Sequence, residues 1–105
     1  MPIQPMKKAR NGFGDVAFGS YTFLVGENAK RCWVCVTCPD TAAAPMLLCL
    51  TQGADVSGQY GLIYLHKGAS IILSMTGDQP WQGSLLATGV GAASYCYWTE
   101  VYLDV

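Results

Sequence analysis

The chain consists of short apolar runs separated by turn residues. No segment of helical length has apolar residues recurring every three and four positions, whereas β-branched and aromatic runs bounded by glycine or proline recur throughout. The predicted strands cover residues 13–18, 21–25, 31–37, 46–51, 60–66, 70–76, 84–88 and 94–103. Each segment between them carries glycine or proline, which permit or fix turns. The pattern predicts an all-β, single-domain antiparallel β-sandwich, jelly-roll-like, with seven to eight short strands.

Alternation within the strands indicates how much of each is buried. The strand 70–76 alternates apolar and polar residues, with Ile72 as the exception, which predicts one solvated face. The strand 94–103 is apolar on both faces. Because a two-layer sandwich covers only one face of each strand with its own core, something else must cover the second face. We expect a subunit or partner interface that includes Trp98 and Tyr102, or alternatively an internal loop.

The composition suits a subunit of an assembly. The length of 105 residues suits one domain. Charged residues make up 12%, against about 25% in typical soluble proteins. No stretch approaches the roughly 18 to 20 apolar residues of a membrane helix, so no membrane partner is expected. A low-charge surface is typical of obligate interfaces, which predicts a homo-oligomer.

The distribution of charge gives one local asymmetry. The net charge of −1 provides no positive field for a nucleic-acid backbone, so nucleic acid is not an expected partner. Lys7, Lys8 and Arg10 make the start of the chain basic. We expect residues 1–12 to form a flexible basic amino-terminal arm before a β-sandwich domain of residues 13–105. The arm is either solvated or docks on an acidic partner.

Five cysteines are present: Cys32, Cys35, Cys38, Cys49 and Cys96. The odd number favours a reduced interior and folding in a cytoplasm. The spacing from Cys32 to Cys38 occurs in some iron-sulfur ligand runs. Here, however, the residues between the cysteines favour a strand, in which Cys35 points away from the other two. We therefore predict no metal and no cofactor, and expect buried thiols or a disulfide between strands.

No constellation of catalytic groups is evident, and the chain is predicted not to be an enzyme. The single histidine, His66, ends a strand, and no helix is predicted that would activate a cysteine beside it. The acidic residues occur singly and are expected to be solvated. They are Asp15, Glu27, Asp40, Asp55, Asp78, Glu100 and Asp104.

The segment 77–83 is the most individual part of the chain. Its Trp81 either caps the open end of the sandwich or stands out as a contact residue. With Tyr60 and Tyr64 it could form a sugar-stacking surface, since a flat ring complements the apolar face of a pyranose. A lectin-like carbohydrate-binding module that contacts a surface glycan is therefore the alternative function.

Part of the chain resembles a known type of protein. The stretches 65–73 and 78–87, with the Pro80-Trp81-Gln82-Gly83 step, and a closing strand that carries Glu100, resemble the last half of small β-sandwich accessory modules of tailed-bacteriophage virions. The resemblance covers about residues 60–103. It implies a non-enzymatic virion protein with a decoration or cement role. Such a protein would bind a capsid or fibre protein, usually as a homotrimer, after folding in the host cytoplasm.

Overall fold

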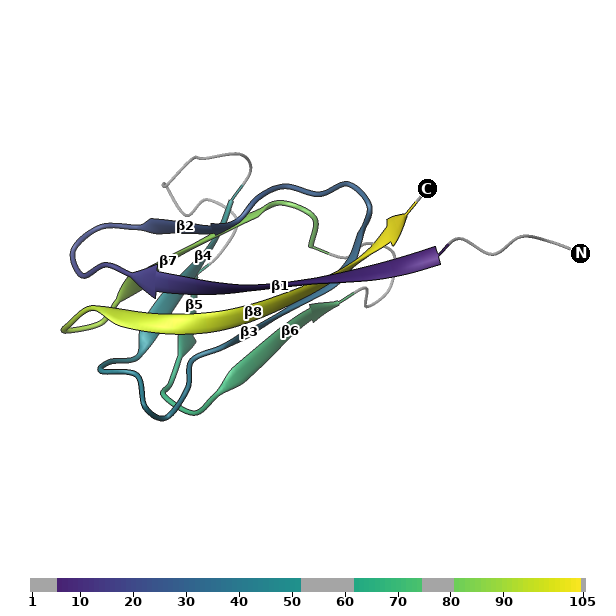
Figure 1. Cartoon of the computed structure of the whole chain (residues 1–105). Coiled ribbons are helices and arrows are strands. Elements are labelled where there is room, and N and C mark those ends of the chain that lie inside the picture. The colour runs from purple at the N-terminus through teal and green to yellow at the C-terminus, as the bar shows by residue number, and fades with distance from the viewer. Residues whose placement is uncertain (1–5, 52–61, 75–80, 105) are drawn as a thin grey trace, which may run out of the picture.

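Eight strands form two antiparallel four-stranded sheets that pack face to face (Figure 1). The computed structural model describes residues 6–51, 62–74 and 81–104. The strands are β1 (Met6–Val16), β2 (Thr22–Val25), β3 (Arg31–Thr37), β4 (Met46–Thr51), β5 (Leu62–Leu65), β6 (Ser70–Ser74), β7 (Ser84–Gly89) and β8 (Ser94–Asp104). The predicted all-β sandwich is confirmed. Over the described ranges, no helix has the length and apolar character needed to span a membrane.

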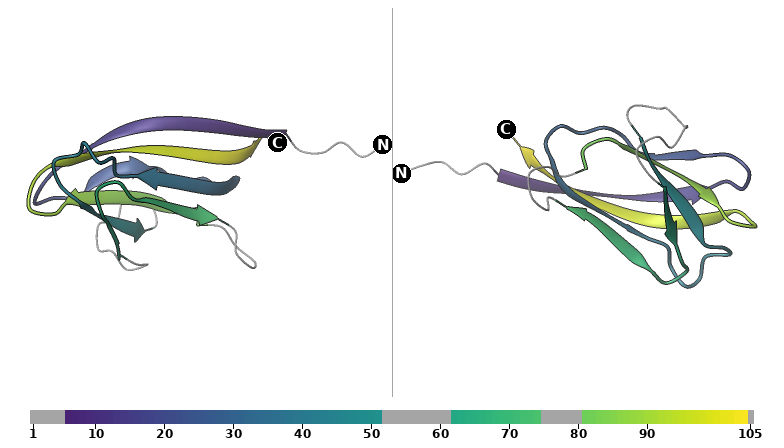
Figure 2. Two further views of the ribbon diagram at one scale, coloured as in Figure 1. Left: turned by 90° about the horizontal axis from the view of Figure 1, so that it is seen from below. Right: turned by 180° about the vertical axis from the view of Figure 1, so that it is seen from behind.

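The order of the strands is that of a hairpin rolled into two layers. The first sheet has the order β1-β8-β3-β6 and the second β2-β7-β4-β5. Each strand pairs with its counterpart from the other end of the chain: β1 with β8, β2 with β7, β3 with β6 and β4 with β5. This is the arrangement of an eight-stranded jelly roll. Figure 2 shows the two layers with the connections crossing between them at the ends.

The inward-pointing residues of both sheets fill the core between the layers. Alternation along β3 turns Val34 and Val36 inward, and alternation along β4 does the same for Met46 and Leu48, all of which are fully buried. Leu85, Ala87 and Cys96 come from the strands beside them. The interior is therefore built from one face of each strand.

Strand β1 begins at Met6, well before the predicted start at residue 13. It pairs with β8 along its whole length, from Met6 opposite Asp104 to Val16 opposite Ser94. Residues 6–12, expected within a flexible basic arm, therefore belong to the longest strand pair of the sandwich. Because most residues of this stretch are polar, apolar alternation does not predict a strand there.

Glycine in β1 makes room for a tryptophan of the neighbouring strand. Gly12 lies opposite Trp98 in the register of β1 and β8. A Cβ atom built on Gly12 would overlap the indole ring of Trp98. One built on Gly14 would meet only the end of the flexible Leu24 side chain at close range. The ring of Trp98 thus occupies space that any side chain at position 12 would need.

Replacing Gly12 with alanine should therefore destabilise the protein more than the same change at Gly14. Overpacking against a rigid ring costs about 1–3 kcal/mol, whereas Leu24 can change rotamer. Urea unfolding of Gly12→Ala and Gly14→Ala at one pH measures the difference in the free energy of unfolding. Equal stabilities of the two variants would contradict the packing described for Trp98.

Candidate assembly surfaces

A buried ion pair joins the two central strands of the first sheet. Arg31 of β3 donates from Nε to Oε2 of Glu100 on β8 at 2.7 Å, and both side chains are inaccessible to solvent. The register of β3 against β8 shifts between Arg31 and Trp33, which is a β-bulge. The extra residue at Cys32 lets Arg31 point to the same side as Val34. Without that bulge, simple alternation would turn Arg31 outward.

The remaining donors of Arg31 hold two connecting segments. Its Nη1 group donates to the carbonyl oxygens of Gly83 at 2.8 Å and Trp81 at 3.3 Å, and its Nη2 group donates to that of Gly26. A buried charge is tolerated when it is both paired and hydrogen-bonded. Strands β2 and β7 belong to the second sheet. By binding the segment after β2 and the segment before β7, the guanidinium group of Arg31 therefore connects the second sheet to the first.

The other oxygen of Glu100 faces the edge of the sheet. It accepts a hydrogen bond from Arg10 of β1 at 2.7 Å, and one from Asn28 at 3.4 Å. The guanidinium carbon of Arg10 lies 5.6 Å from the ring centroid of Trp98, a cation–π distance. The expectation that Glu100 is solvated was wrong, because two arginines and an asparagine compensate for its burial.

The residues predicted to form a partner interface lie on different sides of the first sheet. Lys7, Lys8 and Arg10 are all exposed on β1, with Arg10 engaged by Glu100. On β8, Cys96 and Glu100 are buried inside, and Trp98 packs against the core from the same side. Tyr102 is half-buried and shares that side by alternation.

The three residues predicted to bind a sugar do not form one surface. Trp81 packs against the core and donates from Nε1 to the carbonyl of Ser84 at 3.2 Å, so it caps the sandwich. Tyr64 points outward from β5, with its ring centroid 4.6 Å from that of His66. Tyr60 lies outside the described residues.

The outer face of the first sheet carries three exposed large apolar residues, and sequence patterns did not identify it. Phe13, Tyr95 and Tyr97 form an aromatic cluster, in which the ring centroid of Phe13 lies 5.4 Å from that of each tyrosine. Phe13, Tyr97 and Ile72 are 54%, 51% and 62% exposed. Figure 1 shows this sheet in front of the other layer, with its outer side toward the viewer. Its outward-pointing residues in the described ranges are charged only at Lys7 and Asp15.

The outer face of the second sheet is covered at its centre. A row across this sheet runs from Phe23 through Leu86 and Cys49 to Leu62. The two ends of the row are about half exposed, while Leu86 and Cys49 are buried although they point away from the core. Tyr64 lies beside Leu62 on the same side of β5, so the exposed apolar residues of this face lie at its two edges.

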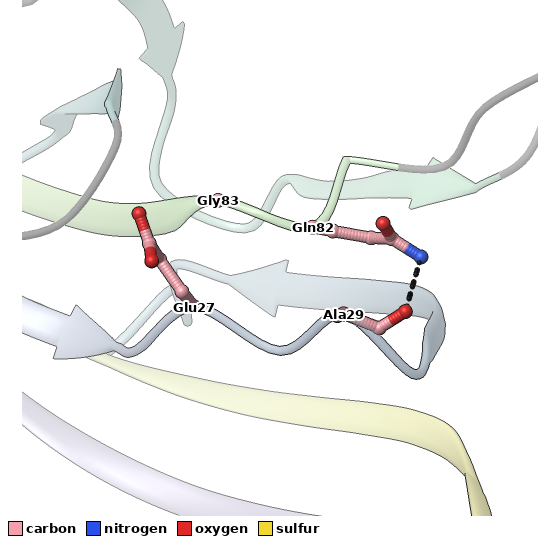
Figure 3. A pocket seen from close by; sticks show the side chains of 4 residues that line it. All are labelled: Glu27, Ala29, Gln82 and Gly83. Carbon is pink, nitrogen blue, oxygen red and sulfur yellow. Dashed lines mark hydrogen bonds between the residues drawn. The ribbon is translucent and has the colours of Figure 1, made fainter.

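A small depression lies beside the ion pair. It has a volume of about 220 Å³ and is lined by Glu27, Ala29, Gln82 and Gly83. Gln82 donates from Nε2 to the carbonyl of Ala29 at 2.9 Å, which joins the two segments that border the depression (Figure 3). Its lining offers one carboxylate, that of Glu27, so no catalytic pair of side chains gathers there.

The thiols are divided between the core and the surface. Cys38, Cys49 and Cys96 are buried, whereas Cys32 and Cys35 are partly exposed. Burial raises the pKa of Cys96 to about 12, helped by the nearby Cys38 thiol, and burial also raises the pKa of Cys38. Cys38 and Cys96 are thus held protonated and act as small apolar side chains. Among the described residues, no group of three or more His, Cys, Asp or Glu could hold a metal ion.

Comparison with known proteins shows the fold and no family. No protein-family model and no curated protein matches the chain. The structure is similar to that of a Bacillus endospore appendage protein, from a family described as disulfide-linked pili, with a TM-score of 0.60 and 16% identity over 97% of this chain and 92% of that chain. A de novo designed double-stranded β-helix aligns with a TM-score of 0.43 and 14% identity over 90% of this chain and 99% of that chain.

The two arginines that contact Glu100 should differ strongly in their importance. Glu100→Gln leaves the charge of Arg31 buried and unpaired, which costs about 3–5 kcal/mol of unfolding free energy. Arg10 is 55% exposed, so Arg10→Gln should cost less than about 1 kcal/mol. Chemical denaturation of the two variants checks both values. A cost for Arg10→Gln as large as that for Glu100→Gln would show that the pair with Arg31 is not the dominant contact.

The raised pKa of Cys96 predicts a loss of stability in alkali. A thiol pKa that is higher in the folded state stabilises the protein below the unfolded value of 9.0, and this stabilisation is lost as the pH rises toward about 12. Cys96 should contribute a slope of up to about 1.4 kcal/mol per pH unit in that window. The free energy of unfolding can be measured from about pH 8 to pH 11, which covers much of that window. Its slope against pH should be flatter for Cys96→Ala than for the unmodified protein. The control Ala43→Ser, a change without a titratable group at an exposed loop position, should keep the slope of the unmodified protein.

Proposed function

We propose that the chain is a non-enzymatic structural subunit that associates with further copies of itself in a larger assembly. The observation that supports the proposal is the exposed apolar area on the outer face of the first sheet, with Phe13, Tyr97 and Ile72 each more than half exposed. A contiguous apolar area on a protein surface marks an interaction site. Its aromatic residues and sparse charges match the composition of interface centres.

The placement of charge supports the same role. Only 12% of the residues are charged, and two of them, Arg31 and Glu100, are buried inside the sandwich. The surface of an isolated copy is therefore poorer in charge than the composition alone suggests. Net charge and interspersed ions keep proteins soluble as monomers, so this chain is suited to a covered environment.

Two settings fit a subunit of this kind. The fold likeness to a Bacillus endospore appendage, described as a disulfide-linked pilus, supports a homopolymeric fibre. The resemblance of about residues 60–103 to phage accessory modules supports a virion protein bound to a capsid or fibre, folded in the host cytoplasm. Both settings require self-association or attachment to a repeating surface, and neither requires a catalytic site.

Mass measurement in solution tests the proposal directly. The purified chain at micromolar concentration should form oligomers or polymers, observed by light scattering and negative-stain electron microscopy. Ile72→Lys places a charge on the outer face of the first sheet. It should raise the protein concentration needed for assembly at least about tenfold, because burying an unpaired ammonium group is costly.

A matched control separates assembly from folding. Ala43→Lys introduces the same charge in the exposed loop between β3 and β4 and should leave both assembly and circular dichroism unchanged. A chain that stays monomeric at about a hundred micromolar, well above the Kd range of stable complexes, would overturn the structural-subunit proposal.

A further inference from the structure

The outward-pointing residues of the first sheet lie in five cross-strand rows. Register pairs of β1, β8, β3 and β6 define them. In order along β1 the rows are Lys7 with Leu103; Ala9 with Val101 and Trp33; Asn11 with Thr99, Cys35 and Ile72; Phe13 with Tyr97, Thr37 and Ser70; and Asp15 with Tyr95. The rows cover one face of the sheet, and its two halves can be compared with each other.

The charges of this face have opposite signs at its two ends. Lys7 and Asp15 are eight positions apart on β1, which corresponds to about 27 Å along an extended strand. Both are exposed. Turning a copy of this face end over end exchanges the positions of the two charges. Two copies stacked in this way would bring each Lys7 to the Asp15 of the other.

From this symmetry we propose that the outer face of the first sheet binds the same face of a second copy, with the strands of the two copies antiparallel. The twofold axis lies along the middle row, that of Asn11 and Cys35. The proposal deepens the function proposed above, because it rests on self-association and names the surface and geometry of one contact. A twofold contact closes on a dimer, so a larger assembly would use a second surface as well.

The sizes of the side chains agree with this arrangement. The row of Phe13 and Thr37 would lie over the row of Ala9 and Trp33 of the second copy. The large Phe13 would face the small Ala9, and the large Trp33 would face the small Thr37. Interfaces and cores pack well when large and small residues alternate across them. On the middle row, Ile72 would meet its own equivalent, an apolar residue that is 62% exposed in the isolated chain.

The alternative stacking, with strands parallel, is less complementary. A twofold axis along the strands would place β1 over β6 of the second copy. Ile72 would then face the polar Asn11, and neither Lys7 nor Asp15 would have an opposite charge across the interface. The parallel stacking therefore lacks the attraction between opposite rim charges that the antiparallel stacking provides.

The size of the face and the nature of its edge favour stacking over edge pairing. Strands of 11, 11, 7 and 5 residues, about 4.8 Å apart, offer a face whose burial on both copies amounts to roughly 1,000 Å², about the minimum for a specific interface. The exposed edge strand β1 carries Lys7, Lys8 and Arg10, and lysine on an edge opposes pairing with another strand. We therefore assign the occupant of this face as a second copy of the chain.

Cross-linking through Cys35 tests the geometry. Because stacked sheets are about 10 Å apart, a short bis-maleimide should join the two Cys35 thiols near the axis. The variant Cys32→Ala, which keeps Cys35, should give covalent dimers on a denaturing gel. The matched variant Cys35→Ala, which keeps the other partly exposed thiol, Cys32, should not. Dimers that form only through Cys32 would overturn the proposed stacking.

A charge exchange tests the pairing of Lys7 with Asp15. Lys7→Glu and Asp15→Lys should each weaken dimerisation roughly tenfold, because two symmetric rim pairs become repulsive. The double variant should restore the affinity of the original chain, since the introduced glutamate of one copy then meets the introduced lysine of the other. Lys67→Glu, a change of an exposed lysine in the turn before β6, is the control and should have no effect. Failure of the double variant to recover affinity would overturn the pairing.

The outcomes also separate this inference from the proposed function. Oligomers that form without a Cys35 cross-link and without sensitivity to the charge exchange would refute the stacking and leave the structural role standing. A monomer would refute both. A monomer whose tryptophan fluorescence changes on titration with cellohexaose, with the change lost in Trp33→Ala, would identify the face as a glycan surface instead.

Discussion

The arrangement of the sandwich depends on the buried contact between Arg31 and Glu100. It joins the two central strands of the first sheet, and the other donors of Arg31 hold the segments that lead out of β2 and into β7. A buried charge can persist only with its partner and its hydrogen bonds in place. The pair therefore couples the two sheets at one end of the molecule and makes the bulge at Cys32 a requirement of the fold.

The burial of Glu100 on the inner face of β8 bears on what the outer face of the same strand carries. A two-layer sandwich encloses one face of each strand, so the second faces meet whatever surrounds the molecule. Here the inner face of β8 carries Glu100, while its outer face carries Tyr95 and Tyr97. This inversion of the usual distribution gives the first sheet an outer face that resembles the centre of an interface. The same strand thus supports the fold with its polar residue and carries the proposed assembly surface with its aromatic residues.

Much of the fold could be predicted from the sequence, because alternation and turn residues are local signals. The strands at residues 31–37 and 46–51 were predicted to the residue. Strand β1 was missed in part because pairing with β8 stabilises its polar half, and pairing is not local. The orientation of β8 could not be predicted, since both of its faces are apolar. Gly12 offered a signal, because a glycine within a strand often marks the close approach of a large neighbour.

The candidate site was less predictable than the fold for a related reason. A residue such as Trp98 is recognisable as an aromatic residue suited to an interface, but its role depends on which side of β8 meets the core. That choice is made by the fit of Trp98 over Gly12 and by the ion pair of Glu100, both contacts between distant parts of the chain. The fold likeness at 16% identity shows that very different sequences satisfy the same topology. What a particular chain does is therefore decided by the residues that the topology leaves facing outward, and in this chain those residues form the surface that we propose for self-association.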